Sequence, residues 1–191
     1  MNYWEKDLVK TLSSMLPLGT KAPDFSLIDV VSGKTINLND GHEYFATLIM
    51  FICNHCPYVK HINSGLAKLS TDYKAKNIRI IAINSNNIEN HPDDSPDNMK
   101  IIAKTEGYQF PYLFDETQEV AKAYHAACTP DFFVFDKYHI LEYRGQFDDS
   151  RPGNGIDLTG SSIRTALDCL ITGKPIPEIQ KPSIGCNIKW K

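Results

Sequence analysis

Two continuously apolar runs, separated by one stretch of helical length, constrain the fold more than any other feature of this sequence. Residues 45–52 read FATLIMFI and residues 78–83 read IRIIAI, which is typical of strands that are buried on both faces. Between these runs, apolar residues recur every three or four positions and predict a helix over residues 56–76. A strand, a helix and a second strand form a βαβ unit, in which the two strands are parallel and the crossover is right-handed.

The rest of the sequence adds strands and helices around this unit. A turn at Ser32–Gly33 predicts a small hairpin or an edge strand, and a turn at Asp136–Lys137 joins two strands into an antiparallel pair. Further expected elements are a short strand over 112–114 and helices over 8–16, 96–106, 117–126 and 161–172. Residues 175–191 are expected to form an irregular tail. We therefore expect one domain over residues 1–191, with an α/β fold of three layers around a mixed central sheet.

Charge and composition exclude several classes of function. The 191 residues carry a formal net charge of -3, and lysine and arginine are scattered, so the basic footprint of a nucleic-acid-binding protein is missing. Neither a membrane span nor a secretory signal is expected, because no long apolar segment of the required kind is present. We therefore expect a cytoplasmic protein, in a compartment where most thiols are kept reduced.

Two of the five cysteines, Cys53 and Cys56, form a Cys-x-x-Cys pair at the predicted junction between strand and helix. The first turn of a helix presents unpaired N–H groups and the positive end of the dipole, which stabilise a thiolate. The thiolate is the reactive form of cysteine. We therefore predict that Cys53 attacks a disulfide and that Cys56 resolves the mixed disulfide. His55 is expected to lower the pKa of Cys53 by its charge or by a hydrogen bond to the sulfur.

Two other interpretations of the Cys53/Cys56 pair stay open. Cys-x-x-Cys is half of a zinc site, which His55, His61 or Cys128 could complete. The sequence contains neither a second Cys-x-x-Cys nor an HxxxH, either of which would strengthen this interpretation. Inert structural thiols are the other alternative. We favour redox chemistry because the pair lies inside a βαβ unit.

A second motif, Cys128-Thr129-Pro130, immediately precedes the predicted strand DFFVF. Proline is allowed at the start of a strand, and a cis bond before it would make a tight bend. A Cys-x-x-Cys at a strand-to-helix junction, followed by Thr-Pro ahead of an antiparallel hairpin, resembles the thioredoxin fold. In that family the cis-proline loop packs against the two cysteines and holds the backbone of the substrate. The resemblance assigns this role to Thr129 and Pro130.

A wider resemblance covers almost the entire chain. The segment KAPDFSLIDVVSGK resembles the N-terminal signature of the alkyl hydroperoxide reductase/thiol-specific antioxidant superfamily, which includes the peroxiredoxins. The segments CNHCPYVKHI, TPDFFVFD, GQFDDSRPGN and SIGCNIKWK together resemble peroxiredoxin-like bacterial proteins of the thioredoxin family. However, no PxxxTxxC precedes either cysteine. In peroxiredoxins a conserved arginine precedes the strand that corresponds to DFFVF, whereas here Thr129-Pro130 stands in that position. Cleavage of a peroxide O–O bond would therefore lose its transition-state stabilisation.

These motifs imply a thiol-disulfide oxidoreductase whose Cys53–Cys56 pair exchanges with protein or small-molecule disulfides. The expected electron donor is of the thioredoxin or glutathione type, and no bound cofactor is expected. The alternatives are a thiol peroxidase with antioxidant activity and a non-catalytic module that binds a metal or a partner. Cys128 and Cys186 are candidate accessory thiols, although both could simply pack. Thioredoxin also buries an acidic residue beneath its second cysteine, whereas residues 46–52 contain none, so no acceptor is assigned for the proton of Cys56.

Overall fold

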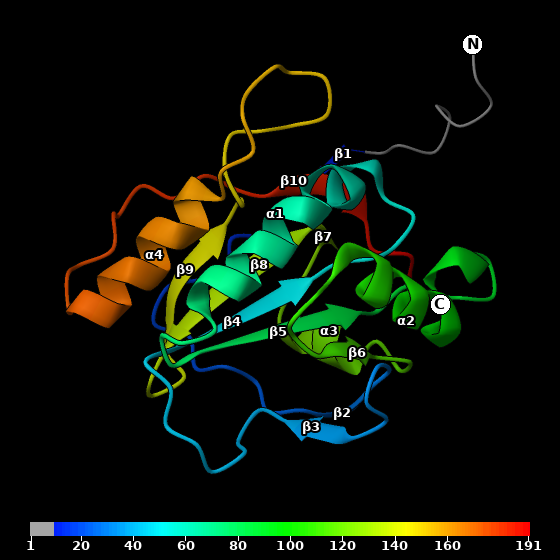
Figure 1. Cartoon of the computed structure of the whole chain (residues 1–191), viewed down its shortest axis with the longest axis horizontal. Helices are drawn as coiled ribbons and strands as arrows, with labels where there is room; N and C mark the ends of the chain where they lie inside the picture. The colour runs from blue at the N-terminus through cyan, green and yellow to red at the C-terminus, as the bar shows by residue number, and fades with distance from the viewer. Residues whose placement is uncertain (1–9) are drawn as a thin grey trace.

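The structure is a computed structural model that describes residues 10–191. Its main element is a seven-stranded mixed sheet with the strand order β3-β2-β6-β5-β4-β8-β9 (Figure 1). The strands of this sheet are β2 (Ser26–Asp29), β3 (Thr35–Asn37), β4 (Ala46–Phe51), β5 (Ile78–Asn84), β6 (Tyr112–Phe114), β8 (Asp131–Asp136) and β9 (Leu141–Gly145). The helices are α1 (Pro57–Tyr73), α2 (Pro96–Glu106), α3 (Glu119–Ala123) and α4 (Ser161–Thr172), with a 3-10 turn, η2, at Pro92–Asp94.

The predicted βαβ unit is confirmed by β4, α1 and β5. β4 is parallel to β5, from the pair Ala46–Ile78 to the pair Phe51–Ile83, and all of its residues are buried. β4 also pairs antiparallel with β8, which in turn pairs antiparallel with β9, so the predicted hairpin is present and the sheet is mixed. Helix α1 begins at Pro57, where the missing N–H group of proline costs nothing.

Helices cover both faces of the large sheet. Apolar side chains of α1, α2 and α4 pack against one face, whereas α3 and the segment before β2 pack against the other. Successive side chains of β4 enter different cores: Leu48 and Met50 point to the first, Ile49 and Phe51 to the second. This alternation follows from the pleat of a strand, which turns neighbouring side chains to opposite faces. The predicted three-layer architecture is confirmed.

A second, three-stranded sheet brings distant parts of the chain together. Its strands are β1 (Lys10–Leu12), β10 (Ile184–Asn187) and β7 (Cys128–Thr129), with β10 in the middle and antiparallel to both neighbours. Figure 1 shows β1 and β10 side by side near the start of α1. This sheet therefore connects the C-terminal segment to the residues that precede Pro130.

Three predictions about individual segments need correction. Residues 10–12 form β1 instead of a helix, and Met15 has a positive φ of 55°; residues 8 and 9 lie outside the described residues. The expected tail over 175–191 contains β10, whose hydrogen bonds come from two distant strands that no local pattern reveals. Helix α3 spans only 119–123, within the predicted 117–126.

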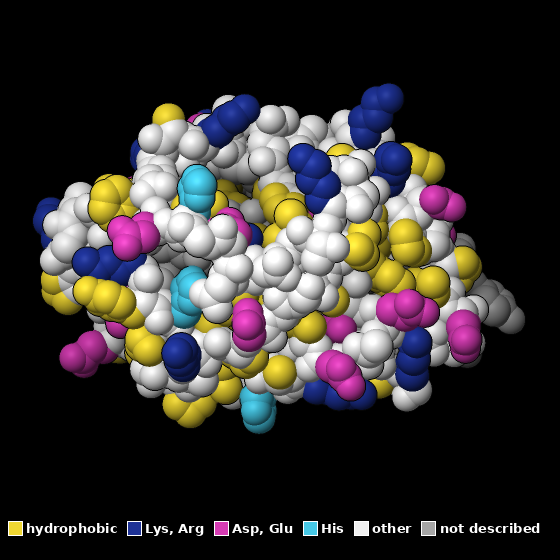
Figure 2. All heavy atoms as spheres, turned by 90° about the horizontal axis from the view of Figure 1, so that it is seen from below, with side chains coloured by type: hydrophobic (Ala, Val, Ile, Leu, Met, Phe, Trp, Pro, Cys, Tyr) yellow, Lys and Arg dark blue, Asp and Glu magenta, His cyan; other side chains and the backbone are white. Residues whose placement is uncertain are grey.

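Helices long and apolar enough to cross a membrane are absent from residues 10–191. On the face seen in Figure 2, basic and acidic side chains are interspersed. This surface agrees with the small net charge of -3 and offers no broad basic patch on that face.

Candidate active site

The Cys-x-x-Cys pair lies where the chain leaves β4 and enters α1. β4 ends at Phe51, and Cys56 is the N-cap residue of α1, so Cys53 lies in the connecting loop. The pair therefore lies at the junction between strand and helix, as predicted, but the residue that borders the opening turn is Cys56 and not Cys53. Pro57 explains the difference, since proline favours the first position of a helix and sets its start.

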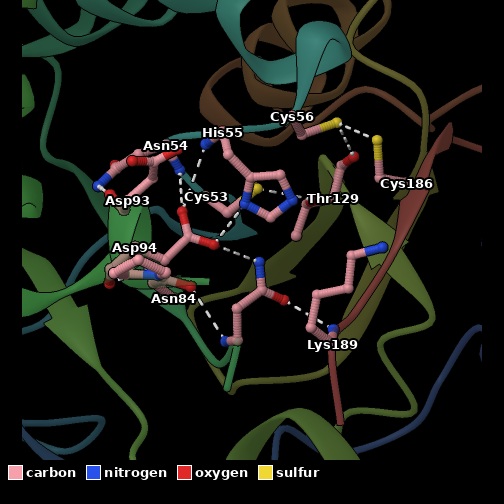
Figure 3. A network of polar contacts seen from close by, with 12 residues as sticks. Cys53, Asn54, His55, Cys56, Asn84, Asp93, Asp94, Thr129, Cys186 and Lys189 are labelled. Atoms are coloured by element: carbon pink, nitrogen blue, oxygen red, sulfur yellow. Dashed lines mark hydrogen bonds and ion pairs between the residues drawn. The ribbon is translucent and has the colours of Figure 1, made fainter. Parts of the chain in front are cut away.

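Three sulfur atoms meet around Thr129 (Figure 3). The Sγ atom of Cys56 lies 2.8 Å from Sγ of Cys186 and 3.2 Å from the carbonyl oxygen of Thr129, to which a protonated Cys56 can donate. The Sγ atom of Cys53 lies 3.1 Å from Oγ1 of Thr129. All three sulfurs are enclosed, since the exposed fractions of the residues are 2% for Cys53, 0% for Cys56 and 4% for Cys186. An external molecule reaches them only when a covering segment moves.

The thiolate of the Cys-x-x-Cys pair is favoured on Cys56. Hydrogen bonds from the thiols of Cys186 and Cys53 and from the backbone N–H group of Val59 lower the pKa of Cys56. Burial raises the pKa of Cys53, and so do its hydrogen bond to Cys56 and the negative charge of Asp94. The lowered pKa thus falls on Cys56, whereas the sequence predicted it for Cys53, because the donors gather on the N-cap sulfur.

The loop before β8 touches both cysteines of the pair. The Thr129–Pro130 bond is cis, as the resemblance to the thioredoxin fold implies. Thr129 contacts Cys53 through its hydroxyl group and Cys56 through its carbonyl oxygen. A hollow beside Pro130 is lined by residues of α1, of the loop after β9 and of β10, among them Tyr58, Arg151 and Ile184. The hollow thus borders the elements that carry Cys56 and Cys186.

A buried carboxylate that the sequence analysis missed, Asp94 in η2, anchors the loop between the two cysteines. Its Oδ1 atom accepts the backbone N–H groups of Asn54 (2.7 Å) and His55 (3.3 Å), and Oδ2 accepts the side-chain amide of Asn86 (2.8 Å). Burial alone would raise the pKa of Asp94, but the hydrogen bonds from His55, Asn86 and Asn54 outweigh it and lower that pKa. The carboxylate therefore stays charged inside the protein.

One sequence signal could have found Asp94. The polar segment NSNNIENHPDD contains the last residue of β5 and continues beyond it, and Asn86 and Asp94 both belong to this segment. Because β4 and β5 are parallel, their carboxyl ends meet at the same edge of the sheet. The segments that follow these two strands are therefore neighbours, and one of them contains Cys53 and Cys56.

The His55 ring faces Asp94. Its Nδ1 atom lies 2.6 Å from Oδ2 of Asp94, and the ring stacks on His91 with 5.0 Å between centroids and 14° between planes. This contact takes the place of the predicted hydrogen bond to the Cys53 sulfur. His55 therefore contacts the carboxylate that also binds the backbone of the cysteine loop.

Cys128 and Asp131 lie on either side of the Thr129–Pro130 bond. The thiol of Cys128 donates to the carbonyl oxygen of Pro130 over 3.5 Å, and burial raises its pKa, as does the charge of Asp131. These contacts favour packing over a relay. Within residues 10–191, no hydrogen-bond donor reaches the buried Oδ1 atom of Asp131, and burial raises the pKa of this carboxyl to about 8. A buried acid is thus present, but at the start of β8 and not in β4.

One group of described residues has the donor atoms for a metal ion. Ligand atoms of Cys53, His55 and Asp94 all lie within 4.8 Å of one another. Thiolate, imidazole and carboxylate are all zinc ligands. Both oxygens of Asp94 already accept N–H groups, so a metal ion would have to displace buried hydrogen bonds. The sulfur of Cys56 faces Cys186 and does not belong to this group. The group is therefore not a metal site built on both cysteines of the pair.

Two solved structures of bacterial proteins are similar over nearly the whole chain. An uncharacterized conserved protein from Geobacillus kaustophilus has 59% sequence identity and a TM-score of 0.93, covering 95% of this chain and 96% of that one. A hypothetical protein from Sinorhizobium meliloti 1021 has 47% identity and a TM-score of 0.92, covering 95% of this chain and 98% of that one. No curated protein matches.

A solved structure with lower sequence identity identifies the fold. The thioredoxin domain of a thiol-disulfide oxidoreductase from Bacteroides vulgatus has a TM-score of 0.60 at 18% identity, covering 78% of this chain and 96% of that one. The fold is therefore thioredoxin-like, as the sequence resemblance implied. A family model described as the AhpC/TSA family matches residues 18–144, a span that includes Cys53, Cys56 and Pro130. The chain belongs to the AhpC/TSA family.

Proposed function

We propose that the protein is a thiol-disulfide oxidoreductase in which Cys53 and Cys56 cycle between dithiol and disulfide. The observation that carries this proposal is the contact of both sulfurs with Thr129, the residue before the cis-proline. The AhpC/TSA family and the thioredoxin-like fold support redox chemistry at thiols. The proposed substrates are protein or small-molecule disulfides, and a thioredoxin- or glutathione-type donor regenerates the dithiol.

The proposed reaction begins at Cys56. Its thiolate attacks one sulfur of the substrate disulfide, so that a mixed disulfide forms and the other substrate sulfur leaves as a thiolate. The Cys53 thiol then loses its proton and attacks the Cys56 sulfur, which closes the Cys53–Cys56 bond and releases the second substrate thiolate. Two electrons pass to the substrate, whose two thiolates take one proton from Cys53 and one from water. This order reverses the roles that the sequence predicted.

The remaining site residues are proposed to position the reactants. Thr129 and Pro130 hold the backbone of the substrate, as the cis-proline loop does in the thioredoxin family. His55 and Asp94 hold the loop that carries Cys53, because the Asp94 carboxylate binds the ring of His55 and two backbone N–H groups of that loop. A charge-assisted hydrogen bond of this kind is about twice as strong as a neutral one.

Reduction of insulin disulfides, with dithiothreitol as the electron donor, tests the proposal. We expect Cys53→Ser and Cys56→Ser each to lower the rate at least about tenfold, since each removes one of the two exchanging sulfurs. Cys169→Ser, which changes a half-buried cysteine of α4, is the matched control and should retain the wild-type rate. Wild-type turnover by Cys56→Ser would overturn the proposal.

A thiol peroxidase is the second candidate, because the family match favours it. The four arginines, which could orient a peroxide, hydrogen-bond other groups: Arg79 the carbonyl of Leu38, Arg144 that of Leu16, Arg151 the side chain of Gln146 and Arg164 the side chain of Asp72. We therefore expect hydrogen peroxide to be consumed no faster than by a free thiol. A much faster, Cys56-dependent rate would favour the peroxidase, and stoichiometric zinc in freshly purified protein would favour a metal-binding module.

A further inference from the structure

Cys186 lies outside the Cys-x-x-Cys motif, but its sulfur is in contact with the sulfur of Cys56. Its Sγ atom lies 2.8 Å from Sγ of Cys56, and both side chains belong to the same buried core cluster. A disulfide bond is about 2.05 Å long, so bond formation requires the two sulfurs to approach by less than about 1 Å. Figure 3 shows the two side chains pointing at each other from α1 and β10.

Backbone pairing fixes the position of Cys186. In the register of the small sheet, Cys186 lies opposite Thr129 on one side and opposite Lys10 on the other. The neighbouring Gly185 permits a very close approach of β10 to β7, since a Cβ atom there would lie 2.0 Å from the carbonyl oxygen of Thr129. Cys186 is therefore held by the same residue that contacts Cys53 and Cys56.

Side-chain hydrogen bonds hold the segment on both sides of β10. The backbone N–H group of Lys189 donates to Asn86, which itself donates to the Asp94 carboxylate. Before β10, the hydroxyl of Ser183 donates to the carbonyl oxygen of Gly145. A thiol held in contact with its target reacts as an intramolecular group, with a correspondingly high effective concentration.

Cys128 provides an internal comparison, because it is also buried and belongs to the adjacent strand β7. Its thiol donates to the Pro130 carbonyl oxygen, whereas Cys186 meets a sulfur. Burial of a cysteine in this sheet is therefore not enough to place it on the redox pair. The position of Cys186 is specific to its strand register.

We propose that Cys186 is a third exchanging thiol of this centre and that the oxidised protein partitions between a Cys53–Cys56 and a Cys56–Cys186 disulfide. This inference rests on the proposed function, because an external disulfide must first oxidise the pair. The sulfur of Cys186 attacks Cys56, the Cys56–Cys186 bond forms and the Cys53–Cys56 bond breaks. The proton lost by Cys186 is taken up by Cys53. No net oxidation occurs, so the exchange needs no further reagent.

The second disulfide would have a structural consequence. It covalently links β10 to the start of α1, whereas the Cys53–Cys56 disulfide leaves β10 held by hydrogen bonds and side-chain packing alone. Because β10 lies over Cys56, the choice of disulfide also decides whether the covering segment is able to move. The centre would therefore alternate between a locked and an unlocked C-terminal segment.

Disulfide mapping tests this inference. Wild type, Cys53→Ser, Cys186→Ser and the control Cys169→Ser are oxidised with oxidised glutathione, quenched in acid, alkylated and digested for mass spectrometry. We expect both linked peptides in wild type and in Cys169→Ser, only Cys53–Cys56 in Cys186→Ser, and Cys56–Cys186 as the main disulfide in Cys53→Ser. Should Cys53→Ser not fold, as judged by circular dichroism, the maps of wild type and Cys169→Ser decide.

Several results would overturn the inference. Absence of the Cys56–Cys186 peptide from wild type would do so, as would linkage of Cys56 to Cys128 as often as to Cys186 in Cys53→Ser. The proposed function is assessed separately by insulin reduction. If wild type shows both disulfides but reduces no insulin, the inference stands and only the proposed reduction of protein disulfides fails. If Cys186→Ser and wild type reduce insulin equally and no Cys56–Cys186 peptide forms, only the inference fails.

Discussion

Nδ1 of His55 lies 2.6 Å from Oδ2 of Asp94, and solvent has no access to that carboxylate. The same carboxylate accepts the backbone N–H groups of Asn54 and His55, the two residues enclosed by the redox cysteines. A single buried charge thus fixes both the backbone and one side chain of the Cys-x-x-Cys loop. Its removal should affect stability and cysteine chemistry together.

We expect Asp94→Asn to lower the free energy of unfolding by about 2–4 kcal/mol at neutral pH, because buried donors lose a charged acceptor. The folded-state pKa of Asp94 is lowered, so its stabilisation is present above pH 3.8, the ordinary value, and is lost as the pH falls through the folded pKa. The difference between variant and wild type should therefore shrink in acid. Urea denaturation across this pH range measures it.

The matched control is Asp93→Asn, the exposed neighbour in η2, which should stay within about 0.5 kcal/mol of wild type. Asp94→Asn also removes a negative charge that raises the pKa of Cys53. The pKa of Cys53 should therefore fall in this variant. A variant as stable as wild type at neutral pH would contradict the structural role assigned to Asp94.

Asp131 should make the protein less stable as the pH rises. Its folded-state pKa is raised to about 8 from 3.8, so the folded state keeps a proton that the unfolded state releases between these two values. Stability should fall with a slope approaching about 1.4 kcal/mol per pH unit in this window and level off above it. Asp131→Asn, which cannot ionise, should lose that slope. The measurement is the free energy of unfolding against pH.

Asp157→Asn, a change at an exposed aspartate, serves as the control and should keep the wild-type slope. The comparison uses slopes rather than absolute stabilities, because the asparagine amide also has to be accommodated at the buried site. Equal slopes in wild type and Asp131→Asn would show that this carboxyl does not hold a proton in the folded protein.

Cys186→Ala should raise the pKa of Cys56. The largest cause of the lowered Cys56 pKa is the hydrogen bond from the Cys186 thiol, which alanine cannot provide. Titration of the ultraviolet absorbance of thiolate measures this change without requiring a reagent to reach the buried sulfur. The control is Cys169→Ala, which should leave the titration unchanged. A Cys56 pKa unaffected by Cys186→Ala would show that the 2.8 Å contact does not stabilise the thiolate.

Gly185→Ala should displace β10. The added Cβ atom would lie 2.0 Å from the carbonyl oxygen of Thr129, a backbone atom that cannot turn aside. We expect a loss of about 1–3 kcal/mol in unfolding free energy, faster proteolysis within 175–191, and faster alkylation of Cys186. Lys181→Ala, which removes only an exposed ion pair on the same segment, should leave all three near wild type. If Cys186 were alkylated as slowly in Gly185→Ala as in wild type, the close approach of β10 to β7 would not be what protects it.

The elements whose sequence signals are local were predictable. β4 and β5 are continuous apolar runs, α1 has helical periodicity, and α2 begins after Ser95 and ends at Gly107 in a left-handed conformation, as the capping residues predict. β10 was not predictable in this way. Its short sequence, Ile-Gly-Cys-Asn, becomes a strand only because β1 and β7 supply partners from more than fifty residues away in the sequence.

The site was predictable to the same extent. The cysteine pair, Thr129 and Pro130 are adjacent in the structure, as the thioredoxin resemblance implied. Which of Cys53 and Cys56 carries the thiolate was not predictable. It depends on the exact residue at which α1 starts and on the thiol of Cys186, which is 130 residues away from Cys56 in the sequence. Asp94 was missed because its contacts with the loop cross between two strand ends, which a scan along a single segment does not reveal.

β10 follows every other described element in chain order, yet it is the middle strand of its sheet. During synthesis, which proceeds from the N-terminus, β1 and β7 therefore have no partner strand between them until residues 184–187 have left the ribosome. Cys53 and Cys56 emerge far earlier. The order of translation thus allows these two sulfurs to bond with each other before Cys186 has been added to the nascent chain.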